Sequence, residues 1–173
     1  MRRRDLEHII RAAGAIAESA ELIVLGSQAI LAAYPDAPGQ LLVSQEVDVY
    51  PRDDPSKADL IDGSIGELSP FHEQFGYYAH GVGPDTATLP PDWQARLIPV
   101  QNENTGGVKG LCLHPSDLAV SKLVAGREKD RQFVADLLKH RLVSEDELRQ
   151  RTSQLEEDLA SRALVVLQRC RPS

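Results

Sequence analysis

Two short polar stretches of this chain carry residues that could bind phosphate and a divalent cation. Gly26 and Ser27 follow an apolar run, and Glu46 and Asp48 stand two residues apart in an alternating segment. A tight Gly-Ser turn leaves backbone N–H groups free to bind phosphate oxygens. Side chains two residues apart in a strand lie on one face, so the two carboxylates could ligate one Mg²⁺ ion.

A strand, a turn and a helix are expected to position the Gly-Ser pair. Residues 22–25 are uniformly apolar, and residues 28–34 have the composition of a helix that ends at the proline-rich segment 35–39. Residues 44–50 alternate between polar and apolar types, which predicts a second strand. The turn and the acid pair therefore belong to neighbouring elements in the chain.

The remaining pattern predicts a fold of the α/β (α+β) class that closes with helices. Residues 1–113 are expected to form an α/β core, and residues 114–173 a helical C-terminal part packed on it. Ser144 and Glu147 have the spacing of a capping box. The other expected elements are an opening helix over 4–20, short helices within 56–76, strands over 76–81, 96–100 and 108–113, a loop over 83–94, and helices over 115–126, 129–139 and 145–168.

Composition favours a cytoplasmic protein. The chain has 173 residues, of which 42% are hydrophobic, and no apolar run reaches the roughly 18 residues that a membrane span needs. The basic start followed by an amphipathic helix does not match a secretion signal. Cys112 and Cys170 are far apart, so they suggest reduced thiols and no metal site.

The distribution of charge argues against a surface that covers duplex DNA. The net charge is −7, whereas such a surface is usually basic. Between residues 109 and 141, however, seven lysines and arginines face four acids, which leaves a local net charge of +3. This stretch fits a local phosphate site, and a solvated helix face is the alternative.

Lys122 stands out within this basic stretch because its neighbours in the helix 115–126 are mostly apolar. Asp117 and Arg127 are each five residues away from it, and a bend after Gly126 could bring the three together. A lysine that projects from an apolar stripe into a cleft is a candidate partner for a triphosphate or a metal site. The alternative is a buried stem with the ammonium group in water.

Taken together, these stretches resemble the nucleotidyltransferase-fold superfamily, which is DNA-polymerase-beta-like. The resemblance rests on the Gly-Ser turn, on the segment 43–48 with its Glu-Val-Asp, and on the segment 122–130 with its Lys-x₄-Arg-x-Lys-Asp. Within this superfamily, the sequence looks most like the AbiEii-type toxins of bacterial toxin–antitoxin systems and their uncharacterised relatives. The resemblance implies a mixed sheet flanked by helices.

The resemblance also implies roles for the motif residues. Gly26 and Ser27 would hold the β- and γ-phosphates of a nucleoside triphosphate (NTP), and Glu46 and Asp48 would ligate Mg²⁺. Lys122 would contact phosphate or orient the metal ligands. The remaining late-motif residues would provide phosphate contacts and local ion pairs: Arg127, Lys129 and Asp130. The implied reaction moves a nucleoside monophosphate (NMP) to an RNA end or a protein hydroxyl, and an antitoxin partner is possible.

Three departures from the superfamily pattern leave an alternative open. Ile30 replaces a frequent arginine, Glu46 replaces an aspartate, and the usual third carboxylate has only Glu103 as a candidate. The chain could therefore be a catalytically degenerate binding or regulatory protein with this fold. A structural protein without a ligand is the third possibility.

The histidines and the aromatic residues give no independent sign of a site. Three of the five histidines, His72, His80 and His114, suggest acid–base chemistry only in isolation and match no metal spacing, so they are expected to have structural roles. The aromatic side chains could stack on a base or pack in the core: Tyr77, Tyr78 and Trp93.

Overall fold

A mixed sheet of five strands lies at the centre of the computed structural model, which describes residues 1–170. The strands are β1 (Glu21–Val24), β2 (Glu46–Pro51), β3 (Tyr78–Gly81), β4 (Ile98–Val100) and β5 (Lys109–Cys112). Their order across the sheet is β3-β2-β1-β5-β4. Strands β1 and β5 are parallel, as are β2 and β3, while the pairs β1–β2 and β4–β5 are antiparallel. The predicted α/β class and mixed sheet are confirmed.

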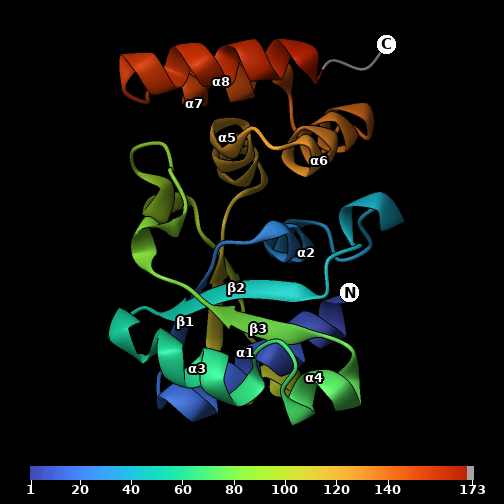
Figure 1. Ribbon diagram of the computed structural model, residues 1–173, viewed down its shortest axis with the longest axis vertical. Helices are drawn as coiled ribbons and strands as arrows, with labels where there is room; N and C mark the ends of the chain where they lie inside the picture. Colours follow the sequence, from blue (N-terminus) through green and yellow to red (C-terminus); the bar gives the residue numbers. More distant parts are fainter. Residues whose placement is uncertain (171–173) are drawn as a thin grey trace.

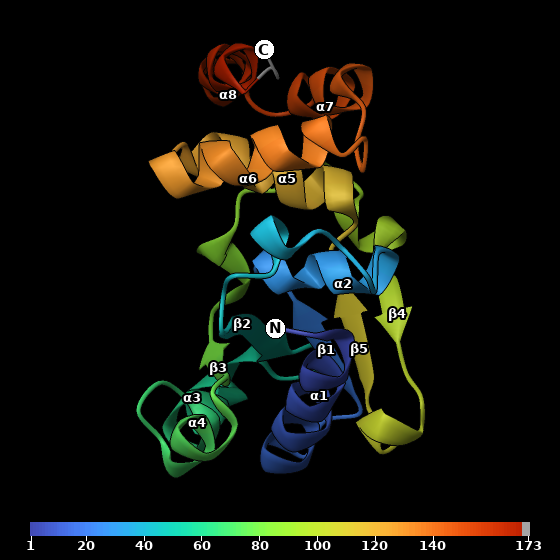
Figure 2. The same cartoon turned by 90° about the vertical axis from the view of Figure 1, so that its right-hand side faces the viewer.

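Helices α1 (Arg3–Ala17), α3 (Ala58–Ile65) and α4 (Pro70–Phe75) lie below the sheet in the view of Figure 1, where α1 crosses the strands β1, β2, β3 and β5, and the C-terminal helices lie above it. Helix α2 (Ile30–Ala33) comes between β1 and β2 in the chain. The last four helices are α5 (Pro115–Ala125), α6 (Glu128–Lys139), α7 (Glu145–Thr152) and α8 (Glu157–Arg169). Helices α5 and α6 form one layer above the sheet, and α7 and α8 form a second layer on top of it (Figure 2). Residues 171–173 of the expected helical part lie outside the described residues.

The apolar core runs continuously from α1 through the central strands to the C-terminal helices. The side chains of Leu6, Ile23, Leu118 and Leu167 are all essentially inaccessible to solvent and belong to one cluster. Burial of apolar surface is the main force that holds these layers together. None of the helices within residues 1–170 is long and apolar enough to cross a membrane.

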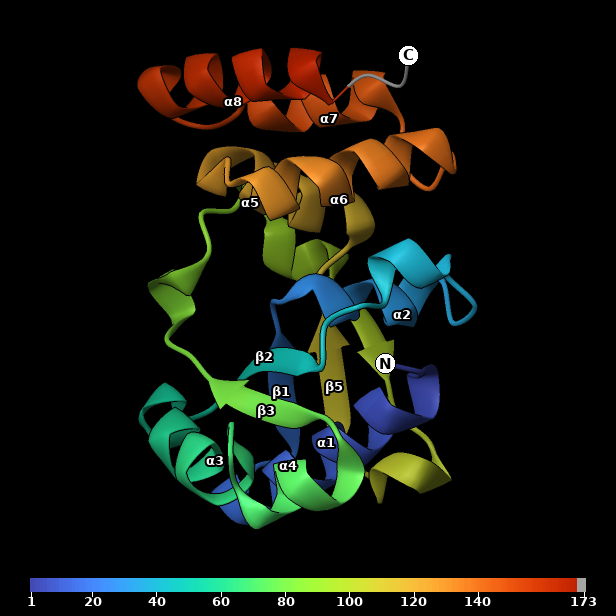
Figure 3. The same cartoon turned by 45° about the vertical axis from the view of Figure 1, so that its right-hand side comes forward.

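The segment after β1 is less helical than the sequence predicts. A single 3-10 turn (Ser27–Ala29) precedes the four-residue helix α2, instead of one regular helix over 28–34. Ile30 and Leu31 point into the core and are fully buried. This connection lies between the sheet, where it contacts β2 and β4, and α5 (Figure 3).

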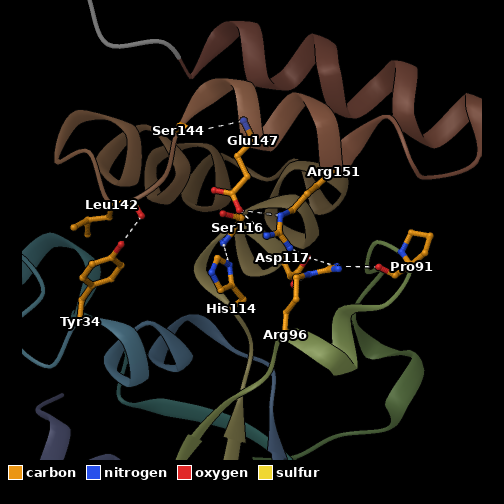
Figure 4. Close-up of polar contacts among 10 residues, drawn as sticks. All are labelled: Tyr34, Pro91, Arg96, His114, Ser116, Asp117, Leu142, Ser144, Glu147 and Arg151. Atoms are coloured by element: carbon orange, nitrogen blue, oxygen red, sulfur yellow. Dashed lines mark hydrogen bonds and ion pairs between the residues drawn. The ribbon is translucent and has the colours of Figure 1, made fainter.

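A buried carboxylate ties the C-terminal helices to the rest of the fold (Figure 4). The side chain of Asp117 is fully buried and accepts two hydrogen bonds from Arg96, at 2.8 and 2.9 Å. It accepts a third from Arg151, at 3.0 Å. Because Arg96, Asp117 and Arg151 come from three separate segments, this carboxylate joins the β4 region, α5 and α7.

Arg151 also explains why the predicted capping box is incomplete. Ser144 caps α7 by accepting a hydrogen bond from the backbone N–H of Glu147 at 3.2 Å, as expected. The Glu147 carboxylate binds Arg151 at 2.6 Å. The serine half of the prediction is therefore confirmed, while the glutamate serves the ion-pair network around Asp117.

Replacing Asp117 by alanine should strongly destabilise the protein. Arg96 and Arg151 would remain partly buried without their shared partner, and removing one member of a buried pair costs about 3 to 5 kcal/mol. The free energy of unfolding from urea titrations checks this. As a control, Glu21→Ala removes a partly exposed acid that pairs with Arg52 and Lys109, and it should have a much smaller effect. Equal losses in the two variants would contradict the assigned role of Asp117.

Candidate functional site

The acid pair lies beside the turn that follows β1. Glu46 and Asp48 share one face of β2, with 38% and 24% of their side chains exposed. The backbone N–H of Leu25 donates to the carbonyl of Asp48 at 3.0 Å, which fixes the turn against the strand. A Cβ atom on Gly26 would lie 2.7 Å from Asp48 Oδ2, so only glycine leaves room for this carboxylate.

Strand β3 adds two side chains to the same face. The parallel register places Tyr78 opposite Glu46 and His80 opposite Asp48. The Tyr78 hydroxyl donates to Glu46 Oε2 at 2.9 Å. His80 Nδ1 lies 3.2 Å from Asp48 Oδ1 and 3.8 Å from Glu46 Oε1. One donor atom from each of Glu46, Asp48 and His80 lies within 4.8 Å of the others, as a shared metal ion would require.

The proximity of the two carboxylates shifts their pKa values in opposite directions. Burial and the neighbouring Glu46 raise the pKa of Asp48 to about 6. Burial also raises the pKa of Glu46, but hydrogen bonds with Asp48 and Tyr78, together with the charges of His80 and Lys129, outweigh it and leave the pKa lowered. The pair therefore concentrates negative charge that a divalent cation would neutralise.

A basic group faces the acid pair from the corner between α5 and α6. Gly126 ends α5 in the left-handed conformation, with a φ of 64°. Around this corner, Lys122 Nζ lies 3.2 Å from Asp130 Oδ1, and Arg127 Nε lies 2.7 Å from Asp130 Oδ2. Asp130 is 1% exposed, and these two cations outweigh the effect of burial and hold its pKa below the ordinary value.

The bend after Gly126 therefore brings Lys122 and Arg127 together, as expected. The acid that they share is Asp130 and not Asp117. Asp117 lies in the network with Arg96 and Arg151 described above. Lys122 is neither a free ammonium group in water nor an isolated projection into a cleft. It is held by Asp130, and its Nζ lies 5.8 Å from the centre of a phenylalanine ring in α6.

Two cavities that share lining residues separate the acidic and basic groups. The larger, of about 400 Å³, is lined by both acids and by Ser27. The smaller, of about 180 Å³, reaches Gly26. Three basic residues and the acid that holds two of them complete the lining of the larger cavity: Lys122, Arg127, Lys129 and Asp130. The structure thus brings all eight residues singled out from the sequence to one place.

Two other predictions about the site need correction. Glu103 cannot supply a third carboxylate, because it follows β4 at the opposite end of the sheet, next to α1. His80, which was expected to be structural, lies instead in the acid pair. The structural interpretation suits the other two histidines. His72 accepts from the Leu68 N–H at 3.1 Å, and His114 accepts from the Ser116 N–H at 3.2 Å as the cap of α5.

Of the three aromatic residues singled out from the sequence, two pack away from the acid pair and one contacts it. Tyr77 packs with a cluster of rings from α1 and α4, and Trp93 is partly buried against the core. Tyr78 is the one that contacts the acid pair, through Glu46.

Nearly the whole chain matches one known protein family. A family described as nucleotidyltransferase of unknown function (DUF6036) matches residues 4–166, which is nearly the whole chain. The chain belongs to this family. No curated protein and no solved structure matches it. Family membership supports the superfamily predicted from the three motifs, whereas the AbiEii-type group is a finer assignment that the match does not make.

In this family member, Gly26→Ala should disturb the acid pair without preventing folding. The backbone at Gly26 has φ −74° and ψ 178°, which alanine can adopt. Its Cβ would displace Asp48, so we expect Mg²⁺ to bind about tenfold more weakly in isothermal titration calorimetry. Gly39→Ala is the matched control, because its Cβ would meet no atom within 4 Å. Equal Mg²⁺ affinities in the two variants would show that the close approach is not needed.

The raised pKa of Asp48 predicts a pH-dependent stability in metal-free protein. The folded protein holds this proton more tightly than the unfolded chain, whose aspartates titrate near about 4. The stabilisation is therefore complete below about pH 4 and is lost as the pH rises through about 6. Relative to Asp48→Asn, the free energy of unfolding should fall by about 2 kcal/mol over this range.

Urea titrations of the wild type and of Asp48→Asn from pH 4 to pH 8 measure the difference between their free energies of unfolding. Titrating groups far from Asp48 contribute equally to both proteins and cancel in this difference. A difference that stays constant or grows with pH would rule out the assigned shift.

Proposed function

We propose that this protein transfers an NMP from an NTP to an acceptor hydroxyl, with a divalent cation held by Glu46 and Asp48. The observation that carries the proposal is the meeting of three separate motifs around two adjoining cavities, with acids on one side and basic residues on the other. Membership of a nucleotidyltransferase family implies an NTP substrate and supports the same conclusion.

The donor set fits a divalent cation at the acid pair. Glu46 and Asp48 offer the carboxylate oxygens that Mg²⁺ prefers, and Gly26 leaves the space that Asp48 needs. Mg²⁺ is therefore the cation that the acid pair itself predicts. When bound, the cation would neutralise charge on the phosphates and polarise the α-phosphoryl group.

The basic group is suited to the triphosphate. The side chain of Arg127 is 60% exposed, so its guanidinium group can donate to phosphate while Nε stays bound to Asp130. Lys122 and Lys129 line the same cavity and add positive charge. Backbone N–H groups at the Gly26–Ser27 turn would hold the terminal phosphates. Together these groups would stabilise the charge that develops on the departing pyrophosphate.

The proposed reaction is a direct displacement at the α-phosphorus. The acceptor oxygen forms a bond to this phosphorus while the bond to the bridging α,β-oxygen breaks. Pyrophosphate leaves with the electron pair, and the proton of the acceptor hydroxyl passes to solvent. An RNA end or a protein hydroxyl is the proposed acceptor, since the net charge of −7 favours local contact over extended binding to nucleic acid.

The biological role that we propose is that of a toxin with an antitoxin partner. Its support is the resemblance of the three motifs to the AbiEii-type group. The alternative is a binding or regulatory protein that has lost catalysis. Two observations favour that alternative: a histidine, His80, and not a third acid lies beside Glu46 and Asp48 within the described residues, and Ile30 is fully buried where many relatives of the superfamily carry an arginine.

Transfer of labelled NMP tests the proposal directly. The protein, Mg²⁺ or Mn²⁺ and each of the four NTPs, labelled at the α-phosphate, are incubated with bulk RNA or with lysate. We expect label in RNA or protein, reduced at least about 100-fold in the double variant Glu46→Gln/Asp48→Asn. Glu103→Gln is the matched control, because this acid is exposed and distant. Expression in bacterial cells should stop growth only when the acid pair is intact.

The outcomes separate the alternatives. Stabilisation by an NTP and a divalent cation without any transfer of label supports the degenerate binding protein and contradicts catalysis. A folded protein whose melting temperature responds to none of the four NTPs contradicts catalysis and supports a binding or regulatory protein that no longer takes an NTP.

A further inference from the structure

We propose that His80 is a direct ligand of the divalent cation and that it makes this centre bind Mn²⁺ in preference to Mg²⁺. The inference deepens the proposed function, on which it rests for the reaction, while the binding of the metal can be tested without it. The resemblance gave no role to His80, and the superfamily pattern expects a carboxylate in a third position.

The donor atoms are spaced as neighbouring ligands of one ion. Adjacent ligands of an octahedral cation with bonds of about 2.1 Å lie about 3 Å apart. His80 Nδ1 lies 3.2 Å from Asp48 Oδ1 and 3.8 Å from Glu46 Oε1. Only small side-chain adjustments are therefore needed for all three to contact the same ion.

The backbone around His80 is fixed by its neighbours on both sides. Parallel pairing with β2 sets the register, and Ala79 is fully buried on the opposite face. A Cβ atom on Gly81 would lie 2.0 Å from the carbonyl oxygen of Ala58, so β3 is pressed against α3. The N–H of Gly81 also donates to Asp62 at 3.2 Å. His80 is thus presented by a rigid strand, which suits a ligand.

The chemistry of the ligands decides which cation is favoured. Mg²⁺ takes oxygen ligands almost exclusively and demands a strict geometry. First-row transition cations accept an imidazole nitrogen as well. Among them Mn²⁺ combines a preference for carboxylates with this tolerance, so two carboxylates and one imidazole suit Mn²⁺ better than Mg²⁺.

A different role for His80, as a counter-charge to the two carboxylates, makes the opposite prediction about the strength of metal binding. If His80 only balances the charge of Glu46 and Asp48 as an imidazolium, it occupies the position of the cation. Removing it would then leave metal binding unchanged or make it stronger. If His80 is a ligand, removing it weakens the binding of Mn²⁺.

The experiment measures metal binding by the 173-residue chain in the absence of nucleotide. Metal-free protein is titrated with Mn²⁺ and with Mg²⁺ by calorimetry, in the wild type and in the variants His80→Ala and His80→Asp. We expect His80→Ala to weaken Mn²⁺ binding at least about tenfold and to weaken Mg²⁺ binding less. His80→Asp should narrow the preference for Mn²⁺. His140→Ala, at the exposed end of α6, is the matched control and should change neither affinity.

Pulsed electron paramagnetic resonance of bound Mn²⁺ gives a second readout that does not depend on how the variants fold. The wild type should show the nitrogen coupling of a coordinated imidazole, and His140→Ala should keep it. Absence of this coupling in the wild type, or unchanged or tighter Mn²⁺ binding in folded His80→Ala, would overturn the inference. Intact Mn²⁺ binding without NMP transfer would instead contradict the proposed function alone.

Discussion

The site depends on the close approach of one carboxylate to one turn. Asp48 lies so near Gly26 that no Cβ fits between them, and its backbone carbonyl accepts the N–H of Leu25. This contact brings the Gly26–Ser27 turn and the acid pair of β2 together. This position disfavours the ionised form of Asp48, because burial and the neighbouring Glu46 raise its pKa. A bound cation would offset this effect, so binding of the cation and order in the site are linked.

Asp130 has the corresponding role on the basic side of the cavity. Its buried carboxylate holds Lys122 and Arg127 at fixed positions, and both side chains keep donors available. The late motif therefore combines two functions that the sequence alone could not separate. The acid at its end orients the cations, while the cations themselves face the cavity. Local pairing of this kind limits the side-chain entropy that these two cations would lose on binding a phosphate.

Much of the fold could be predicted from the sequence, because periodicity and turn residues report local structure. The strand before Gly26, the Glu-Val-Asp strand and the break at Gly126 were all predicted. Features that depend on pairing between distant strands were not. The role of His80 follows from the parallel register of β3 with β2, and local patterns do not encode that register. The one available signal was that Tyr78 and His80 alternate on a short strand, as Glu46 and Asp48 do.

The network around Asp117 bears on how this architecture could change over time. A single carboxylate satisfies arginines from the β4 region and from α7, and Tyr34 donates to the carbonyl of Leu142 at 2.7 Å. The last helices are therefore not an interchangeable attachment. A shortened descendant that lacked α7 and α8 would lose Arg151, leave Asp117 with Arg96 alone and uncover the face of α5 on which both helices pack, so it would need compensating changes in α5 in the same step. Such coupled changes make loss of α7 and α8 difficult, and they favour inheritance of the whole unit.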